Sequence, residues 1–168
     1  GLRAENRDFT AVLMFREPLV HAASLLAMHR RYSAMQKDDP FVRTYMDWLA
    51  HHEFGGGHKP FCFDAEADEV TGDVDTLADW LGRWVGYYRH ALSMEAHRLL
   101  FVGHAAWSAD PHGVLRTILS ETEVNADVPD LSPHEGRRNV DPVNVDPTRL
   151  EAARHVYDQL VARALPLS

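Results

Sequence analysis

Two short apolar runs, at residues 10–15 and 98–103, stand out from the mixed sequence around them. An apolar run of this length without polar alternation is typical of a strand buried on both faces, as in parallel α/β sheets. We therefore predict two strands, both of the buried parallel type.

Elsewhere, apolar residues recur at the spacing of three and four that is typical of amphipathic helices. Pro18 suits the first position of a helix, and Asp39 and Asp110, each followed by proline, are predicted N-caps. The three glycines at 55–57 are expected to end the second helix. The predicted helices cover residues 18–36, 41–52, 73–93, 111–121 and 147–164.

Four of the predicted helices, at residues 18–36, 41–52, 73–93 and 147–164, have an apolar face. A face of this kind usually points into the core. In the third helix this face is a stripe of aromatic residues, which indicates core packing more than a ligand site. The apolar positions of these helices are Leu19, Ala22, Ala23, Leu26 and Met28; Phe41, Tyr45, Trp48 and Leu49; Leu77, Trp80, Leu81, Trp84, Tyr87, Tyr88 and Leu92; and Leu150, Ala153, Val156, Tyr157 and Leu160.

The predicted fold class is α/β, with about six helices dominating two buried strands in one domain over residues 1–168. Residues 124–146, rich in Asp, Pro and Asn, are expected to form an extended surface arm. Two strands do not make a stable open parallel sheet, because each leaves an unpaired edge. We therefore expect neighbouring strands in sequence that this chain lacks, and the uncovered edge favours pairing with another chain as a homo-oligomer.

Composition narrows the function classes. The chain has 168 residues, 45% hydrophobic and 25% charged, and a net charge of −8 argues against non-specific binding to nucleic acid.

No apolar run reaches the roughly 20 residues that a membrane span needs, and no signal peptide is visible. The single cysteine, Cys62, cannot form an internal disulfide, which fits a cytoplasmic location. The chain starts without Met, so we expect its start to be a cut.

The first strand ends at Arg16, and a short turn leads into the next helix. Ligands of open α/β sheets gather at the carboxyl ends of strands, and helix starts attract anions. Arg16 could clamp a phosphate, and Ser24 could add a hydroxyl donor eight positions later. His21, one turn before Ser24 on the same helix face, could also reach the ligand. The spacing alone favours another interpretation, in which Arg16 pairs with a carboxylate while Ser24 packs against a helix.

Residues 13–26, Leu-Met-Phe-Arg-Glu-Pro-Leu-Val-His-Ala-Ala-Ser-Leu-Leu, resemble the 3′-phosphate-binding motif of sulfotransferases that use 3′-phosphoadenosine-5′-phosphosulfate (PAPS). Residues 48–61 and the order of the later elements are also similar to bacterial members of that family. The resemblance implies that Arg16 and Ser24 contact the 3′-phosphate of the donor. It further implies a P-loop-type parallel sheet, of which this chain is the C-terminal part.

The sequence departs from the family at two places. After the second strand, a Tyr/Arg-x-Glu-Asp-Leu type sequence is replaced by His104-Ala-Ala-Trp107. The P-loop-like Pro-Lys-Ser-Gly-Thr-Thr motif, which binds the 5′-phosphosulfate, does not occur, and the family's usual catalytic base lies in the same N-terminal half. The full-length form should transfer a sulfuryl group to a hydroxyl or amine of a small-molecule or glycan acceptor. We expect this chain alone to be inactive, with no catalytic residue of its own.

Two further clusters are open to more than one interpretation. Arg137 and Arg138 resemble a basic pair that many sulfotransferases bring to the 3′-phosphate, but they also fit a solvated pair in an acidic arm. His51, His52 and His58 with Glu53 suggest a metal hydrolase, but their spacing does not fit the zincin pattern, so we expect no metal.

A rival to the enzyme is a non-catalytic module, either a degenerate nucleotide binder or a helical domain that binds a partner.

Overall fold

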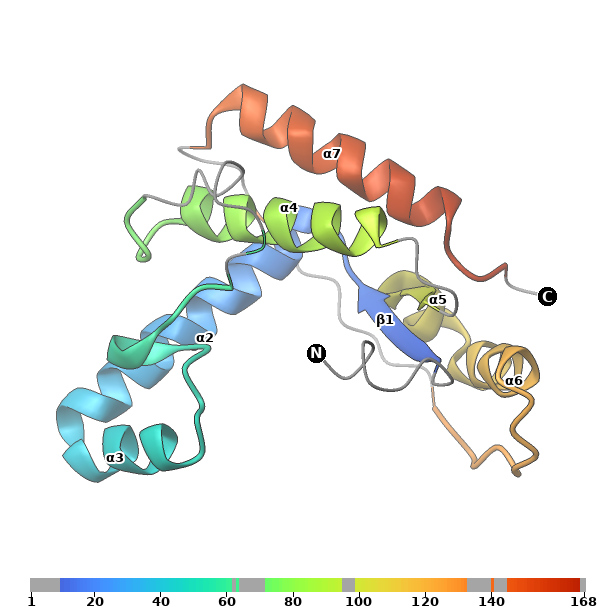
Figure 1. Ribbon diagram of the computed structural model, residues 1–168, viewed down its shortest axis with the longest axis horizontal. Helices are drawn as coiled ribbons and strands as arrows, with labels where there is room; N and C mark the ends of the chain where they lie inside the picture. Colours follow the sequence, from blue (N-terminus) through green and yellow to red (C-terminus); the bar gives the residue numbers. More distant parts are fainter. Residues whose placement is uncertain are drawn as a thin grey trace. The chain divides into compact units, whose positions relative to one another are not determined.

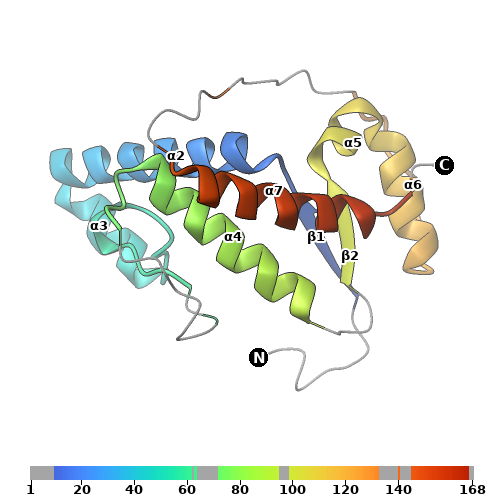
Figure 2. The same cartoon turned by 90° about the horizontal axis from the view of Figure 1, so that it is seen from above.

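The computed structural model describes residues 10–61, 63, 72–94, 99–132, 140 and 145–166. Within these residues it is a mixed α/β protein dominated by helices, with six α-helices, one 3-10 turn and one two-stranded parallel sheet (Figures 1 and 2). The elements are β1 (Ala11–Phe15), α2 (Pro18–Asp38), α3 (Pro40–Trp48), η1 (Gly55–Gly57), α4 (Leu77–Ser93), β2 (Leu99–Gly103), α5 (His104–Ala109), α6 (Pro111–Glu121) and α7 (Pro147–Ala162).

The chain forms two compact units. Unit 1 comprises residues 1–17, 92–138 and 157–168, and unit 2 comprises residues 18–91 and 139–156.

Unit 1 is built on the parallel pairing of β1 with β2, which lie side by side in Figure 2. The register runs from Ala11 opposite Leu99 to Phe15 opposite Gly103. The backbone N–H of Leu165 donates to the carbonyl of Phe101 at 2.9 Å, so the segment after α7 is held against β2. The buried side chains of this unit are Phe15, Phe101, Val102, Val114 and Leu160.

The two strands are confirmed, but burial of β1 on both faces is wrong. Val12 and Met14 are 45% and 41% exposed, whereas Phe15 is 2% exposed. Alternate positions of β1 are covered, as expected for a sheet with one packed face. An apolar run therefore identified the strand but not the number of its covered faces.

Unit 2 is packed around α4, whose aromatic stripe is largely buried as predicted. Trp80, Trp84 and Tyr88 are 4%, 2% and 3% exposed, while Tyr87 is 37% exposed and lies outside the core. The Arg149 guanidinium of α7 donates to the carbonyl of Ala78 at 3.0 Å and ties the start of α7 to the start of α4. The other buried apolar residues of this unit are Ala22, Leu26, Met46, Leu81, Val85, Ala91, Val145, Ala153 and Val156.

The predicted helix N-caps are confirmed. Asp39 accepts from the N–H of Phe41 at 2.9 Å, and Asp110 accepts from the N–H of Gly113 at 2.8 Å. Each carboxylate satisfies a backbone donor that has no partner within the first turn of its helix. The short helix α5, which follows β2 directly, was not predicted.

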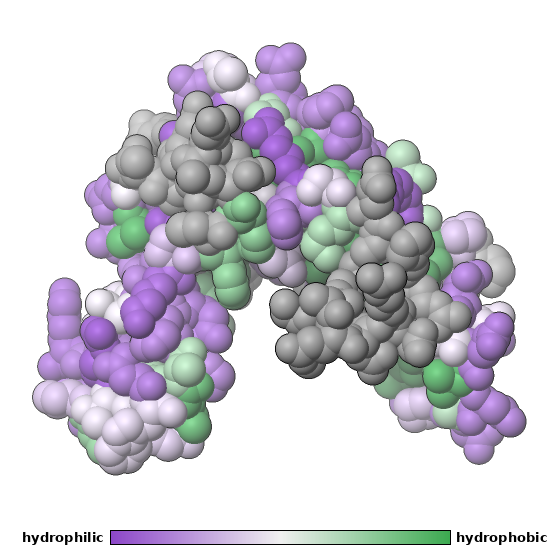
Figure 3. Space-filling model, viewed as in Figure 1, coloured by the Kyte–Doolittle hydropathy of each residue, from purple (hydrophilic) through white to green (hydrophobic). Residues whose placement is uncertain are grey.

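Helix α3 differs from the prediction in length and in orientation. It ends at Trp48, and Ala50 then takes a left-handed φ of 55° before the glycines, which form η1 instead of a helix end. Its expected core face is at the surface, since Phe41, Tyr45 and Trp48 are 57%, 50% and 72% exposed. Some hydrophobic residues, in green, are visible on the surface at the lower left of Figure 3, where Figure 1 draws α2 and α3.

The side chain that α3 buries is Met46, whose sulfur lies 3.2 Å from Nε2 of Gln36 on α2. Helix α3 therefore packs on α2 through one flank of its apolar stripe and leaves the rest exposed. Periodicity places a stripe on a helix, but it does not say which part of the stripe meets a neighbour.

Residues 124–132 have no regular secondary structure, as expected for the start of the predicted arm; residues 133–139 and 141–144 lie outside the described part of the chain. No helix within the described residues is both long enough and apolar enough to cross a membrane.

Two leucine substitutions test which helix faces are buried in the core. Leu81→Ala, at a site with 0% exposure, should lower the free energy of unfolding by about 2–5 kcal/mol, because it removes buried methyl groups and leaves a cavity. Leu49→Ala, at 49% exposure, should cost less than about 1 kcal/mol. Urea unfolding monitored by circular dichroism measures both. Equal losses would mean that the α3 stripe is buried after all.

Candidate functional site

Arg16 lies in the two-residue turn between β1 and α2, directly after the carboxyl end of β1. Phe15 is paired with Gly103 at the end of β2, and His104 opens α5 immediately afterwards. Because the strands are parallel, both of their carboxyl ends lie at one edge of the sheet. Arg16 is partly exposed there. Unit 1 thus has a guanidinium at the edge where α/β proteins bind their ligands.

Ser24 lies in α2 and is partly buried. Its hydroxyl donates to the carbonyl of Val20, one turn earlier, at 2.8 Å. This bond back into the helix is common for serine and occupies the hydroxyl hydrogen. In this rotamer Ser24 can accept a hydrogen bond from a ligand, and it must rotate to donate one.

His21 also lies on α2, three positions before Ser24. Its ring is 6.3 Å from the ring of Tyr88 on α4, centroid to centroid. Burial raises the pKa of the Tyr88 phenol, so Tyr88 is neutral at physiological pH and presents an uncharged surface. His21 therefore helps to pack α2 against α4, in addition to any part it has in binding.

Arg16 belongs to unit 1, whereas His21 and Ser24 belong to unit 2. The convergence of Arg16 and Ser24 on one phosphate therefore stays a prediction. The other two predicted ligands, Arg137 and Arg138, lie outside the described residues.

The histidines of residues 51–58 have separate surroundings. Nδ1 of His51 lies 3.3 Å from Oε1 of Glu53, and Nδ1 of His52 lies 3.5 Å from Oδ1 of Asp47. The ring of His58 instead lies 5.2 Å from the ring of Trp80. Within the described part of the chain, no group of three or more His, Cys, Asp or Glu side chains could hold a metal ion.

A pair of histidines in unit 2 was missed by the sequence interpretation. The rings of His29 on α2 and His58 after η1 are 5.6 Å apart, and both contact the ring of Trp80. His29 is 4% exposed, and its Nδ1 accepts from the N–H of Gly55 at 3.3 Å. The only hint in the sequence is that His29 continues the apolar positions 22 and 26 along one face of α2.

Burial is the main reason why the pKa of both histidines is lowered. Arg83 adds to the lowering at each ring, and Arg30 adds to it at His29. Asp75 and Asp79 act in the opposite direction on His29, as do the backbone carbonyls of Glu53 and His52 on His58. Both rings are therefore neutral in the folded protein at neutral pH, which lets His29 accept the bond from Gly55.

Comparison of the chain with protein-family models, with curated proteins and with solved structures gave no match.

The histidine pair predicts a pH dependence of stability. Both folded-state pKa values lie below the ordinary value of 6.5, so the unfolded chain binds more protons once the pH falls below that value. The free energy of unfolding should be largest above about pH 6.5 and should decrease as the pH falls further, by at most about 1.4 kcal/mol per pH unit for each histidine.

Urea unfolding between pH 7.5 and 5 measures this dependence. The double variant His29→Gln, His58→Gln should show a shallower decrease over this interval, whereas His155→Gln, at an exposed position of α7, should keep the wild-type slope. If the double variant keeps the wild-type slope as well, the histidine pair does not cause the pH dependence of stability.

Proposed function

We propose that the chain is the donor-binding part of a sulfotransferase and that Arg16 and Ser24 hold the 3′-phosphate of PAPS. The observation that carries the proposal is the turn from β1 into α2, with Arg16 at the carboxyl edge of a parallel strand pair and a serine eight positions later. This arrangement supports the motif resemblance, because the resemblance requires a strand that ends at the arginine and a helix that carries the serine.

The chemistry of the turn suits a phosphate. A guanidinium can form two parallel hydrogen bonds to phosphate oxygens, and it stays charged at any physiological pH. The first turn of α2 contains no acidic residue that would oppose an anion at the positive end of the helix dipole. The net charge of −8 and the neighbouring Glu17 oppose an anion, so the Arg16 guanidinium and the positive end of α2 would have to hold the phosphate.

Ser24 would contribute by changing its hydrogen-bond partner. On binding, its hydroxyl would leave the carbonyl of Val20 and donate to a phosphate oxygen, which is the stronger, charge-assisted bond. The carbonyl of Val20 keeps its place in the helix, and the hydroxyl would change its partner by rotation about χ1 of Ser24.

The remaining chemistry is not encoded in these 168 residues. Sulfuryl transfer relies on groups that stabilise negative charge around the reacting sulfur, and the sequence contains no 5′-phosphosulfate motif. The proposed activity, transfer to a hydroxyl or amine of a small-molecule or glycan acceptor, therefore belongs to a form that has that motif. This chain alone would bind the donor without turning it over.

Isothermal titration calorimetry with adenosine 3′,5′-bisphosphate tests the proposed site. The wild-type chain should bind, and Arg16→Ala should weaken binding by about 1.5–3 kcal/mol, roughly 10- to 150-fold, because a charge-assisted contact is lost. Arg116→Ala, at an exposed position of α6, is the matched control and should bind as the wild type does.

Adenosine 5′-monophosphate, which lacks the 3′-phosphate, should bind more weakly and should not respond to Arg16→Ala. A chain that does not bind the bisphosphate at millimolar concentration would refute the proposal and leave the partner-binding alternative. Steady transfer of label from PAPS by the isolated chain would refute its expected inactivity.

A further inference from the structure

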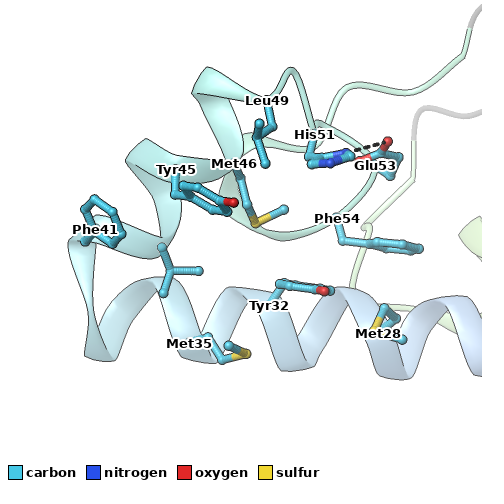
Figure 4. Close-up of a pocket in the computed structure, with 11 residues that line it drawn as sticks. Met28, Tyr32, Met35, Phe41, Tyr45, Met46, Leu49, His51, Glu53 and Phe54 are labelled. Carbon is cyan, nitrogen blue, oxygen red and sulfur yellow. Dashed lines mark hydrogen bonds and ion pairs between the residues drawn. The ribbon is translucent and has the colours of Figure 1, made fainter.

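A groove of about 530 Å³ lies within unit 2, between α2 and α3 (Figure 4). Side chains from the two helices face each other across it, and His51, Glu53 and Phe54 border it beyond the end of α3. Small-molecule sites in proteins have volumes of roughly 300–1,000 Å³, so the groove is large enough for a ligand of modest size.

Four aromatic rings line the groove in two stacked pairs. Phe41 and Tyr45 are 5.9 Å apart, and Tyr32 and Phe54 are 6.1 Å apart with an interplanar angle of 8°. An aromatic face carries partial negative charge and attracts organic cations. Phe41 and Tyr45 are at least half exposed, so these rings are accessible to a ligand.

Three of the five methionines of the chain, Met28, Met35 and Met46, also line the groove. Thioether side chains are flexible and polarisable, and they adapt to apolar ligands of different shape. Together with the rings they give the groove an apolar wall on each side.

The fixed charge among the residues that line the groove is the carboxylate of Glu53, which lies beside His51. Oε1 of Glu53 lies 3.3 Å from Nδ1 of His51, as the dashed line in Figure 4 marks. A hydrogen bond from its own backbone N–H, and then the one from His51, lowers the pKa of the Glu53 carboxyl, so it is ionised at neutral pH. Among the described residues that line the groove there is no Lys or Arg. A cationic ligand therefore finds a carboxylate, whereas an anionic one finds no fixed positive charge.

We propose that this groove binds a small primary amine with an aromatic body, with the ring between the methionines and aromatic side chains and the ammonium at Glu53. Binding in this groove does not depend on the proposed nucleotide site, because the groove shares no residue with it.

Methionine methyl groups provide the test, because the chain contains its own controls. The whole chain, labelled with ¹³C at the methionine methyls, is titrated at pH 7.5 with 2-phenylethylamine, 2-phenylethanol and 3-phenylpropionate. These probes share an aromatic body and carry a cationic, a neutral and an anionic end. The signals of Met28, Met35 and Met46 should shift, and those of Met14 and Met94, which do not line the groove, should stay in place.

The amine should bind about fivefold more tightly than the alcohol, which is the upper range for a partly exposed ion pair, and the carboxylate should bind most weakly. Glu53→Gln keeps the shape of the side chain and should bring the affinity for the amine down to that for the alcohol, with the alcohol unchanged. Glu151→Gln, at an exposed position of α7, should keep the preference.

Three results would overturn the proposal: no shift of the three groove signals at tens of millimolar amine, equal shifts of all five signals, or an amine preference that survives in Glu53→Gln. Binding of the nucleotide by the same sample is measured separately, so the failure of one site does not mimic the failure of the other.

Discussion

The parallel pairing of β1 with β2 is the constraint on which the proposed donor site depends. Phe15 is fixed opposite Gly103, it is 2% exposed, and its ring lies 5.8 Å from the ring of Tyr157 on the C-terminal part of α7. A buried aromatic residue at the last position of a strand holds the strand end firmly, so the residue after it leaves the sheet at a defined place. That residue is Arg16, which therefore follows the carboxyl edge of the sheet directly.

The sequence predicted the regular elements well, because local signals determine them. The apolar runs, the aspartates at positions 39 and 110 and the prolines that follow them act within a few residues, and each was found where it was predicted. The faces of the elements were harder to predict. Helices α3 and α4 have equally clear apolar stripes, yet Trp84 is 2% exposed and Trp48 is 72% exposed. Which stripe becomes core depends on contacts between distant segments, and periodicity contains no information about these.

The same difference separates the predicted site from the sites that were missed. Arg16 could be placed at a strand end because a strand end is a local feature. His29 and His58 meet only because α2 and the turn after η1 both pack on Trp80, and their spacing of 29 positions gives no sign of this. The groove between α2 and α3 was also missed, since the prediction assigned the α3 stripe to the core. A ligand can reach the groove because the α3 stripe is exposed, whereas a stripe that packs in the core is closed to ligands.

The central claim is that Arg16 and Ser24 share one phosphate, and a crystal structure of the chain with adenosine 3′,5′-bisphosphate tests it most directly. The account predicts the 3′-phosphate within about 3 Å of both the Arg16 guanidinium and the Ser24 hydroxyl, which is the length of a charge-assisted hydrogen bond. It also predicts that the Ser24 hydroxyl no longer donates to Val20. A phosphate bound elsewhere, or a Ser24 hydroxyl too far from Arg16 for one anion to reach both, would contradict the account.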